Sequence, residues 1–155
     1  MQSRKKEKNE QKEVPTVNKG NVDASSYSGY LAEIEKSMGS GMTYNDTLEK
    51  KGKSLFGPLF LGVYPKDKIP GLISRQSCIF NLDTSGQKGS HWCAMYKQGS
   101  RRYVYDSFGR QVLGSGTSYT DPDAEQTDAE KNCGQRCIAW LLTVYLNGLS
   151  EALKV

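Results

Sequence analysis

Several features that define common protein classes are missing from this sequence of 155 residues. No apolar stretch approaches the ~20 residues that a membrane span requires. The first residues, MQSRKKEKNEQKEV, contain no apolar run of the kind found in secretory signals. We therefore expect a protein that is not secreted and that keeps its thiols reduced in the cytoplasm or nucleus.

Histidine is almost absent as well, since His91 is the only one, and the four cysteines include no C-x-x-C pair. A structural zinc site built from paired cysteines and histidines is therefore disfavoured, and so is a thioredoxin-like redox motif. Cys133 and Cys137 are spaced C-x3-C, which leaves a packing role or a single nucleophile as the better interpretations. We expect no bound metal.

The N-terminal segment is polar and basic. Residues 1–25 are rich in Lys, Glu, Gln and Asn, a composition that buries too little apolar surface to offset the entropy of ordering, so we expect a disordered tail. Residues 26–155 would then form one folded domain. Formal net charge is +4, and part of the basic excess clusters in the tail, at Arg4, Lys5, Lys6 and Lys8. This cluster could support weak DNA binding, although a tail that only maintains solubility is the simpler interpretation.

Apolar spacing predicts helices first and strands afterwards. One helix would start near Ser26 and end at Gly39, and a shorter one would start at Asn45 or Asp46 and end at Gly52. Strands and a final buried helix follow, with a long exposed loop between them: a strand within 55–64, strands at 77–82, 91–97 and 101–107, the loop at 109–130, and the helix over Cys133–Leu146. This order predicts an α+β domain with an antiparallel or mixed sheet packed on a central core helix.

His91 begins the first strand of a predicted hairpin. Pairing Lys97 with Arg101 across a three-residue turn places His91 opposite Ser107, beside Asp106. A carboxylate in that position would hold the imidazole in one tautomer and stabilise its charged form. Taken alone, however, a histidine is more often a surface or core residue, and Asp106 could equally be a turn residue.

Cys133 opens the apolar run CGQRCIAWLLTVYL. A thiol at a helix N-terminus is favoured as thiolate by the exposed N–H groups and the helix dipole, and thiolate is the reactive nucleophile. Gly134 would let the backbone pass close to a substrate, and N–H groups at this turn could bind an oxyanion. Cys137, Cys78 and Cys93 are expected to be core residues.

In chain order, GSHW, YDSFG and CGQRC resemble the adenovirus-type maturation proteases, or adenains, which belong with the SUMO-specific (Ulp-type) cysteine proteases. FLGVYPKDKIPG and IFNLDTSGQKGSHW add to the likeness, which covers residues ~55 to ~147. The resemblance implies a papain-like helix-and-sheet core in permuted order, with catalytic residues in the order His, Asp or Glu, Gln, Cys. It implies Gln126, rather than Gln135, as the oxyanion-hole glutamine.

The same resemblance implies a cysteine endopeptidase that cuts after small residues, often glycine. Cys133 would attack the scissile carbonyl, His91 would move the proton, and Asp106 would orient His91. Trp92 would form one wall of a narrow substrate groove, and Gly134 would lie against the substrate backbone.

The implied biological setting is that of a small DNA virus, of the kind that includes virophages. Substrates would be capsid and core precursor polypeptides, cleaved by a monomer without a cofactor in the virion and in the host cytoplasm or nucleus. Two alternatives stay open. One is a SUMO or ubiquitin-like isopeptidase of the same fold, and the other is a basic, DNA-binding structural protein of the virion.

Overall fold

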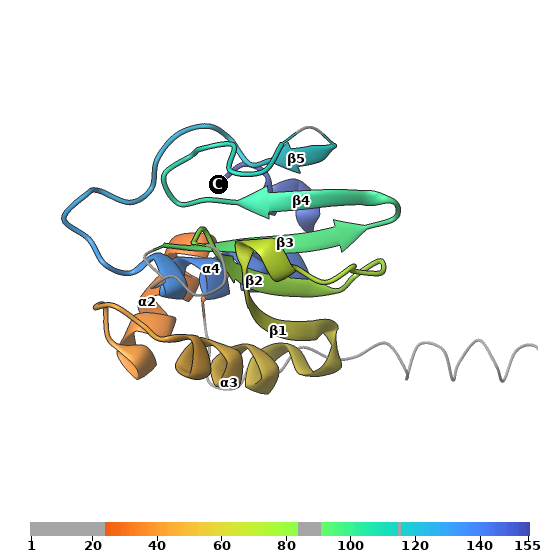
Figure 1. Cartoon of the computed structure of the whole chain (residues 1–155). Coiled ribbons are helices and arrows are strands. Elements are labelled where there is room, and N and C mark those ends of the chain that lie inside the picture. Colours follow the sequence, from red (N-terminus) through yellow and green to blue (C-terminus); the bar gives the residue numbers. More distant parts are fainter. Residues whose placement is uncertain (1–23, 84–90, 115) are drawn as a thin grey trace, which may run out of the picture.

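The computed structural model describes residues 24–83, 91–114 and 116–155. Almost all of the predicted tail, including its basic cluster at positions 4–8, lies outside these residues. Within them, five strands form one sheet in the order β1-β2-β3-β4-β5, with helices packed against it (Figure 1). No helix among the described residues is long and apolar enough to cross a bilayer.

Among the described residues, two helices precede the sheet in the chain: α2 (Tyr27–Met38) and α3 (Asn45–Phe56). The first follows the prediction and ends at Gly39, whose φ of 78° suits glycine. The second was predicted to end at Gly52, which is wrong, because α3 continues for another turn and ends before Gly57. Gly52 faces Phe60, and an ideal Cβ there would lie 2.6 Å from Phe60 Cζ. Close packing therefore explains this glycine inside the helix.

The sheet is mixed. Strands β2 and β3 are antiparallel, as are β3 and β4, whereas β1 runs parallel to β2 and β5 runs parallel to β4. The bounds are β1 (Phe60–Pro65), β2 (Ser77–Asn81), β3 (Trp92–Gln98), β4 (Arg101–Tyr105) and β5 (Thr117–Tyr119). Strand β5 was not predicted, since it lies within the segment 109–130 that we expected to be a loop. The α+β class with a mixed sheet is confirmed.

The hairpin of β3 and β4 differs from the predicted register by one residue. Lys97 pairs with Arg102 and Gln98 pairs with Arg101, so the turn consists of Gly99 and Ser100 alone. Gly99 has φ of 61°, as a tight two-residue hairpin turn requires. The predicted pairing of Lys97 with Arg101 was therefore wrong.

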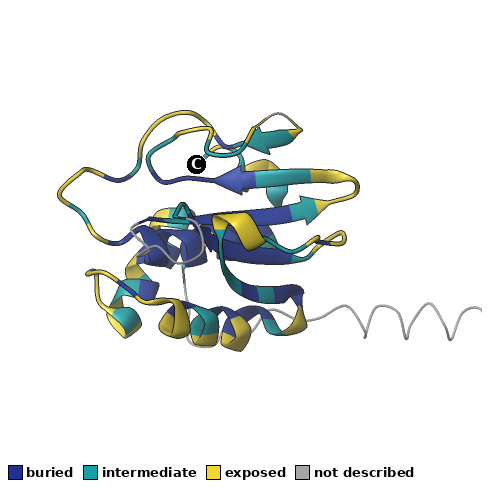
Figure 2. Cartoon of the chain, viewed as in Figure 1, coloured by how far each residue is buried: buried dark blue, intermediate teal, exposed yellow. Residues whose placement is uncertain are grey.

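Helix α4 (Cys133–Leu142) packs against β3 and α2, and all of its residues are buried (Figure 2). Its Trp140 stacks on Tyr105 of β4, with ring centroids 5.5 Å apart. The chain continues through a π-helical turn (Thr143–Asn147) into a short helix, α5 (Leu149–Ala152). The predicted final helix therefore begins where expected and changes geometry after Leu142.

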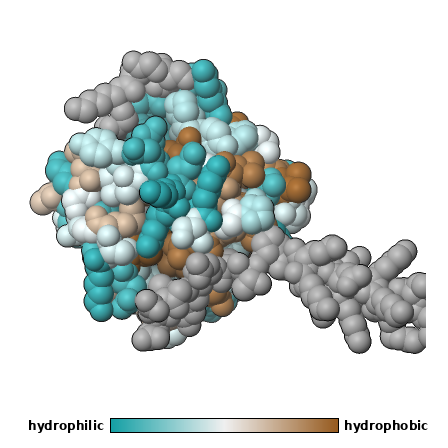
Figure 3. All heavy atoms as spheres, turned by 90° about the horizontal axis from the view of Figure 1, so that it is seen from below, coloured by the Kyte–Doolittle hydropathy of each residue, from teal (hydrophilic) through white to brown (hydrophobic). Residues whose placement is uncertain are grey.

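Side chains alternate between the two faces of the central strands. Ile79 and Ala94 contribute to the large core under α4. Cys78 and Met95, one position away on the same strands, belong to a smaller apolar cluster on the opposite face. Both faces of the sheet are therefore covered. On the surface seen from the α3 side, hydrophilic side chains run across the middle, with apolar patches beside them (Figure 3).

Candidate active site

Three predicted site residues stand at the ends of three elements. His91 directly precedes β3, Asp106 directly follows β4, and Cys133 is the first residue of α4. Because β3 and β4 are antiparallel, the start of β3 and the end of β4 lie at the same end of the sheet, and α4 begins there as well (Figure 1). The sheet and the helix together bring the three residues to one place.

His91 and Asp106 form a short, buried contact. Nε2 of His91 lies 2.5 Å from Oδ1 of Asp106, and their side chains are 9% and 0% exposed. Burial disfavours the charged carboxylate, but hydrogen bonds from His91 and Arg110 outweigh it and lower the pKa of Asp106 to about 2. Asp106 is therefore a carboxylate at neutral pH.

His91 also interacts with Cys133, because each of the two groups shifts the pKa of the other. Burial lowers the pKa of His91, but the hydrogen bonds to Asp106 and Cys133 outweigh it and raise the pKa to about 9. Burial raises the pKa of Cys133, and its net pKa is nevertheless lowered, by His91 and by the backbone N–H groups of Trp92 and Gly134. The two shifts act in the same sense, because each favours the charged form of its group, the thiolate of Cys133 and the imidazolium of His91.

Arg110 completes the surroundings of Asp106, and the sequence interpretation did not include it. Its Nε lies 2.8 Å from Oδ2 of Asp106, and its backbone N–H donates to the same oxygen at 3.1 Å. Its guanidinium sits over the ring of Phe108, which in turn stacks on His91 with centroids 4.8 Å apart. The segment YDSFGR could have indicated Arg110, because a buried aspartate needs hydrogen-bond donors and the turn that follows Asp106 supplies them.

Gln126, the predicted oxyanion-hole residue, is buried in the loop before α4. Its Oε1 accepts a hydrogen bond from Ser107 Oγ at 2.6 Å, and its Nε2 donates to the Glu130 carbonyl at 2.8 Å. Its backbone N–H also donates to the Ser107 carbonyl, so this loop is attached to the residue that follows Asp106. Within the described part of the chain, one hydrogen of the amide is left for another acceptor.

The competing glutamine, Gln135, is held elsewhere. Its Nε2 donates to the carbonyl oxygens of Gly39 and Gly41, at 2.7 and 2.9 Å. Both donors of this amide thus fix the loop between α2 and α3 to α4. This arrangement is consistent with the preference for Gln126.

Trp92 and Gly134, predicted to contact substrate, both touch Thr43 in that same loop. The indole Nε1 of Trp92 donates to the Thr43 carbonyl at 3.1 Å. Gly134 faces Thr43 and Leu48, and an ideal Cβ on it would lie 2.9 Å from Leu48 Cδ2. Close packing is therefore a sufficient reason for glycine at this position, and its N–H donates to the Cys133 sulfur.

The other thiols are unsuited to nucleophilic chemistry. All four cysteines are free, and burial raises the pKa of Cys78 to about 12 and the pKa values of Cys93 and Cys137 well above the ordinary range. Possible ligand atoms of His91, Cys93 and Asp106 lie within 4.8 Å of one another. These residues do not fit a metal, because the Asp106 oxygens are bound by His91 and Arg110 and Cys93 is held as a neutral thiol.

No protein-family model matches the sequence, and no curated protein matches it either.

Proposed function

We propose that the protein is a cysteine endopeptidase with Cys133 as its nucleophile. The observation that carries the proposal is the grouping of three residues at one site: Asp106 holds His91 at 2.5 Å, and His91 and Cys133 shift each other's pKa toward imidazolium and thiolate. An activated thiol at a helix N-terminus beside an imidazole that can carry the proton is the arrangement that acyl transfer through sulfur requires.

The proposed reaction has two halves. The Cys133 thiolate attacks the scissile carbonyl carbon, and the resulting oxyanion is stabilised by backbone N–H groups at the start of α4 and by the free N–H of Gln126. His91 gives its proton to the leaving amine as the C–N bond breaks, which leaves a thioester on Cys133. A water molecule then attacks the thioester while His91 accepts its proton, releasing the acid and the thiolate.

The chain order His, Asp, Gln, Cys and the hairpin that carries the first two support an adenain-like assignment, with a papain-like core in permuted order. On this basis we assign polypeptide substrates cleaved after small residues, with Trp92 as a wall of the groove, and capsid and core precursors as the natural targets. The enzyme would act as a monomer in the virion and the host cytoplasm or nucleus. Weak DNA binding through positions 4–8 belongs to the same proposal.

Mass spectrometry after treatment with an irreversible thiol-directed electrophile tests the chemistry. We expect selective labelling of Cys133 among the four thiols, together with cleavage of glycine-containing peptides. Cys133→Ala should abolish that cleavage, whereas Cys137→Ala, a core substitution one turn later, should retain it. Cleavage by Cys133→Ala would overturn the proposal.

Two further measurements separate the alternatives. Faster turnover of a ubiquitin-like substrate ending in Gly-Gly than of a short peptide would indicate an isopeptidase of the same fold. Salt-sensitive DNA binding without any labelling of Cys133 would indicate a structural DNA-binding protein instead.

A further inference from the structure

Arg136 lies one turn after Cys133 in α4 and is 7% exposed. A guanidinium can leave water only where its donors are satisfied, and three different groups receive them here. Its Nε donates to Asn132 Oδ1 at 3.0 Å, its Nη1 to Tyr27 Oη at 3.1 Å, and its Nη2 to Glu130 Oε2 at 3.2 Å. None of these contacts is required by the reaction proposed above.

One group of contacts holds the residue just before the nucleophile. Asn132 is 4% exposed, and its side chain is held between Arg136 and Glu35 of α2, with Asn132 Nδ2 donating to Glu35 Oε2 at 2.9 Å. The Asn132 carbonyl also accepts the backbone N–H of Arg136 at 3.0 Å. The backbone that leads into Cys133 is thereby fixed on both sides.

A second group of contacts leads to the oxyanion glutamine. Oε2 of Glu130 pairs with Arg136, while its Oε1 accepts hydrogen bonds from the N–H and the hydroxyl of Thr127, at 2.8 and 3.2 Å. The carbonyl of the same residue accepts Nε2 of Gln126. Glu130 is therefore the link between Arg136 in the catalytic helix and the Gln126 side chain.

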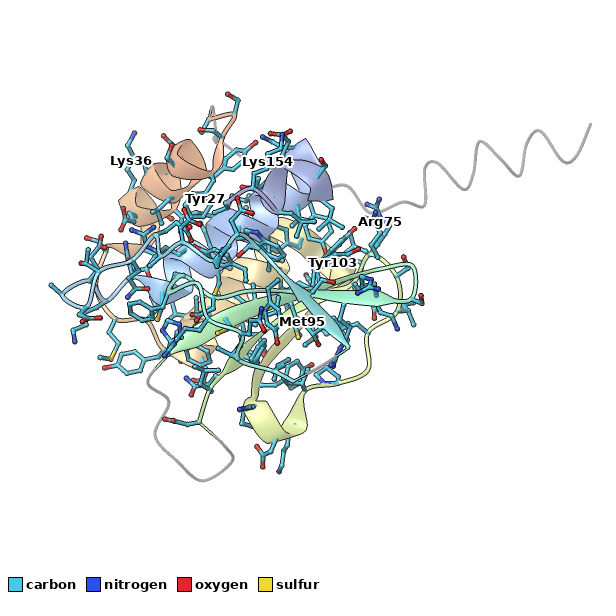
Figure 4. The ribbon with its side chains drawn as sticks, turned by 90° about the horizontal axis from the view of Figure 1, so that it is seen from above. Tyr27, Lys36, Arg75, Met95, Tyr103 and Lys154 are labelled. Atoms are coloured by element: carbon cyan, nitrogen blue, oxygen red, sulfur yellow. The ribbon has the colours of Figure 1, made fainter. Side chains whose placement is uncertain are left out.

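The third contact joins Arg136 to the sheet. Tyr27 is the first residue of α2, on the side of that helix near α4 (Figure 4), and its hydroxyl is 2.6 Å from the hydroxyl of Tyr105 in β4. Burial raises the pKa of Tyr27 to about 12, so it presents a neutral hydroxyl to Arg136. Through Tyr27, the Arg136 guanidinium is thus fixed to α2 and to the sheet, and through Glu130 it also binds the loop that carries Gln126.

We propose that Arg136 is a positioning residue, which fastens the loop of Gln126 to the turn of Cys133 through Glu130 and Asn132. In this role it fixes the distance between the glutamine N–H and the attacking sulfur, although it touches neither substrate nor sulfur. The inference rests on the proposed endopeptidase activity and names what keeps its oxyanion donors in place.

Glu130→Gln is the main test, because it removes the negative charge that pairs with Arg136. The Glu130 side chain is 40% exposed, so the substitution should disturb the fold little. Arg136→Lys keeps the charge and loses the three-way fork of donors, and Arg136→Met removes both. Glu151→Gln is the matched control, since Glu151 forms an exposed pair with Lys154 away from the site.

The decisive readout compares two ligands of the same peptide sequence. A peptide aldehyde forms a tetrahedral adduct with an oxyanion at Cys133, whereas the matched peptide amide binds without one. We expect Glu130→Gln and Arg136→Met to weaken binding of the aldehyde by about tenfold and to leave binding of the amide almost unchanged. In peptide hydrolysis, the same variants should reduce kcat and leave KM unchanged. Arg136→Lys should fall between the wild type and Arg136→Met.

Three results would overturn the proposal: equal loss of aldehyde and amide binding, a KM effect without a kcat effect, or wild-type kinetics in Glu130→Gln. If Arg136→Met does not fold, Glu130→Gln still decides. The pH profile of Cys133 alkylation keeps the two proposals apart. A wild-type protein without a reactive Cys133 contradicts the endopeptidase itself, whereas an active wild type with unaffected variants contradicts only the role of Arg136.

Discussion

Arg110 binds one carboxylate oxygen of Asp106 with both its side chain and its backbone N–H, and this leaves the other oxygen to His91. The two oxygens of Asp106 differ in their partners. Oδ2 is bound by Arg110 alone, whereas Oδ1 contacts His91 and also accepts the backbone N–H of Phe108 at 3.3 Å. Contacts on both oxygens restrict rotation of the carboxylate, which a single hydrogen bond to His91 would not do.

Removal of that anchor should destabilise the protein in a pH-dependent way. The low pKa of Asp106 contributes stability at pH values above the ordinary aspartate pKa, and this contribution is lost as the pH falls toward 2. Arg110→Met raises the pKa of Asp106, so we expect a loss of about 1 kcal/mol in the free energy of unfolding at pH 6, which shrinks at pH 2.5. Urea unfolding at the two pH values measures this difference. A loss of equal size at both would show that packing on Phe108, rather than charge, is responsible.

The carboxylate itself should matter more for activity than its anchor. In Asp106→Asn the amide presents either an oxygen or an N–H to Nε2, and it no longer stabilises the imidazolium. We expect kcat/KM to fall by roughly 10²- to 10⁴-fold and the pKa of His91 to drop, as followed by NMR titration of this single histidine. Asp121→Asn, at an exposed position after β5, is the control. An unchanged His91 pKa in Asp106→Asn would contradict the assigned contact.

Cys133 should react with iodoacetamide at a lower pH than an ordinary thiol. Its pKa is lowered by His91 and by two backbone N–H groups despite burial, and His91 stays protonated up to about pH 9. We expect alkylation at pH 6 to label Cys133 alone, and His91→Ala to shift the midpoint of the rate profile upward. Labelling of Cys78 or Cys137 at a similar rate would show that the site is not selectively activated.

Glu125 offers a test on stability alone. Both of its carboxylate oxygens are buried, and burial together with the nearby Asp123 raises its pKa to about 7. The folded protein keeps this proton between pH 4.5 and 7, while the unfolded chain releases it, so stability falls as the pH rises through that range. Glu125→Gln should therefore raise the melting temperature at pH 8 and leave it nearly unchanged at pH 4. The same gain at both pH values would contradict a titration effect.

Two glycines allow a paired test of packing. A methyl group at Gly134 meets Leu48 and Thr43, and one at Gly52 meets the ring of Phe60. Each Gly→Ala change should cost about 1–3 kcal/mol in the free energy of unfolding, as overpacked cores do. Only Gly134→Ala should also slow the alkylation of Cys133, because the backbone that must shift to make room for the methyl group carries the N–H that lowers the pKa of the adjacent thiol, whereas Gly52 lies in α3. Equal alkylation rates in the two variants would argue against an effect of this N–H on the thiol.

The sequence predicted the parts of the site that depend on local order. His91 and Asp106 lie at the open end of one hairpin, so any register near the true one brings them together, and the one-residue error did no harm. That error arose because QGS is compatible with turns of two or three residues. The helix was wrongly predicted to end at Gly52, because nothing nearby in the sequence indicates that this glycine packs against Phe60.

Arg110 was missed although it lies only four residues after Asp106, but other missed residues act over long distances in the chain. Arg136 contacts Tyr27, a sequence separation of 109, and Asn132 contacts Glu35, a separation of 97. No periodicity or motif predicts such pairs. Strand β5 was missed for a related reason, since its three residues have little pattern of their own and pair only because β4 is already in place.

Helix α4 is buried along its whole length and follows all five strands in the chain. The large core under the sheet is built in part from α4 residues, so the sheet cannot complete that core until this last long helix docks. The sulfur of Cys133 comes beside His91 in the same step, so the appearance of a fast-reacting thiol during refolding should report the completion of the core.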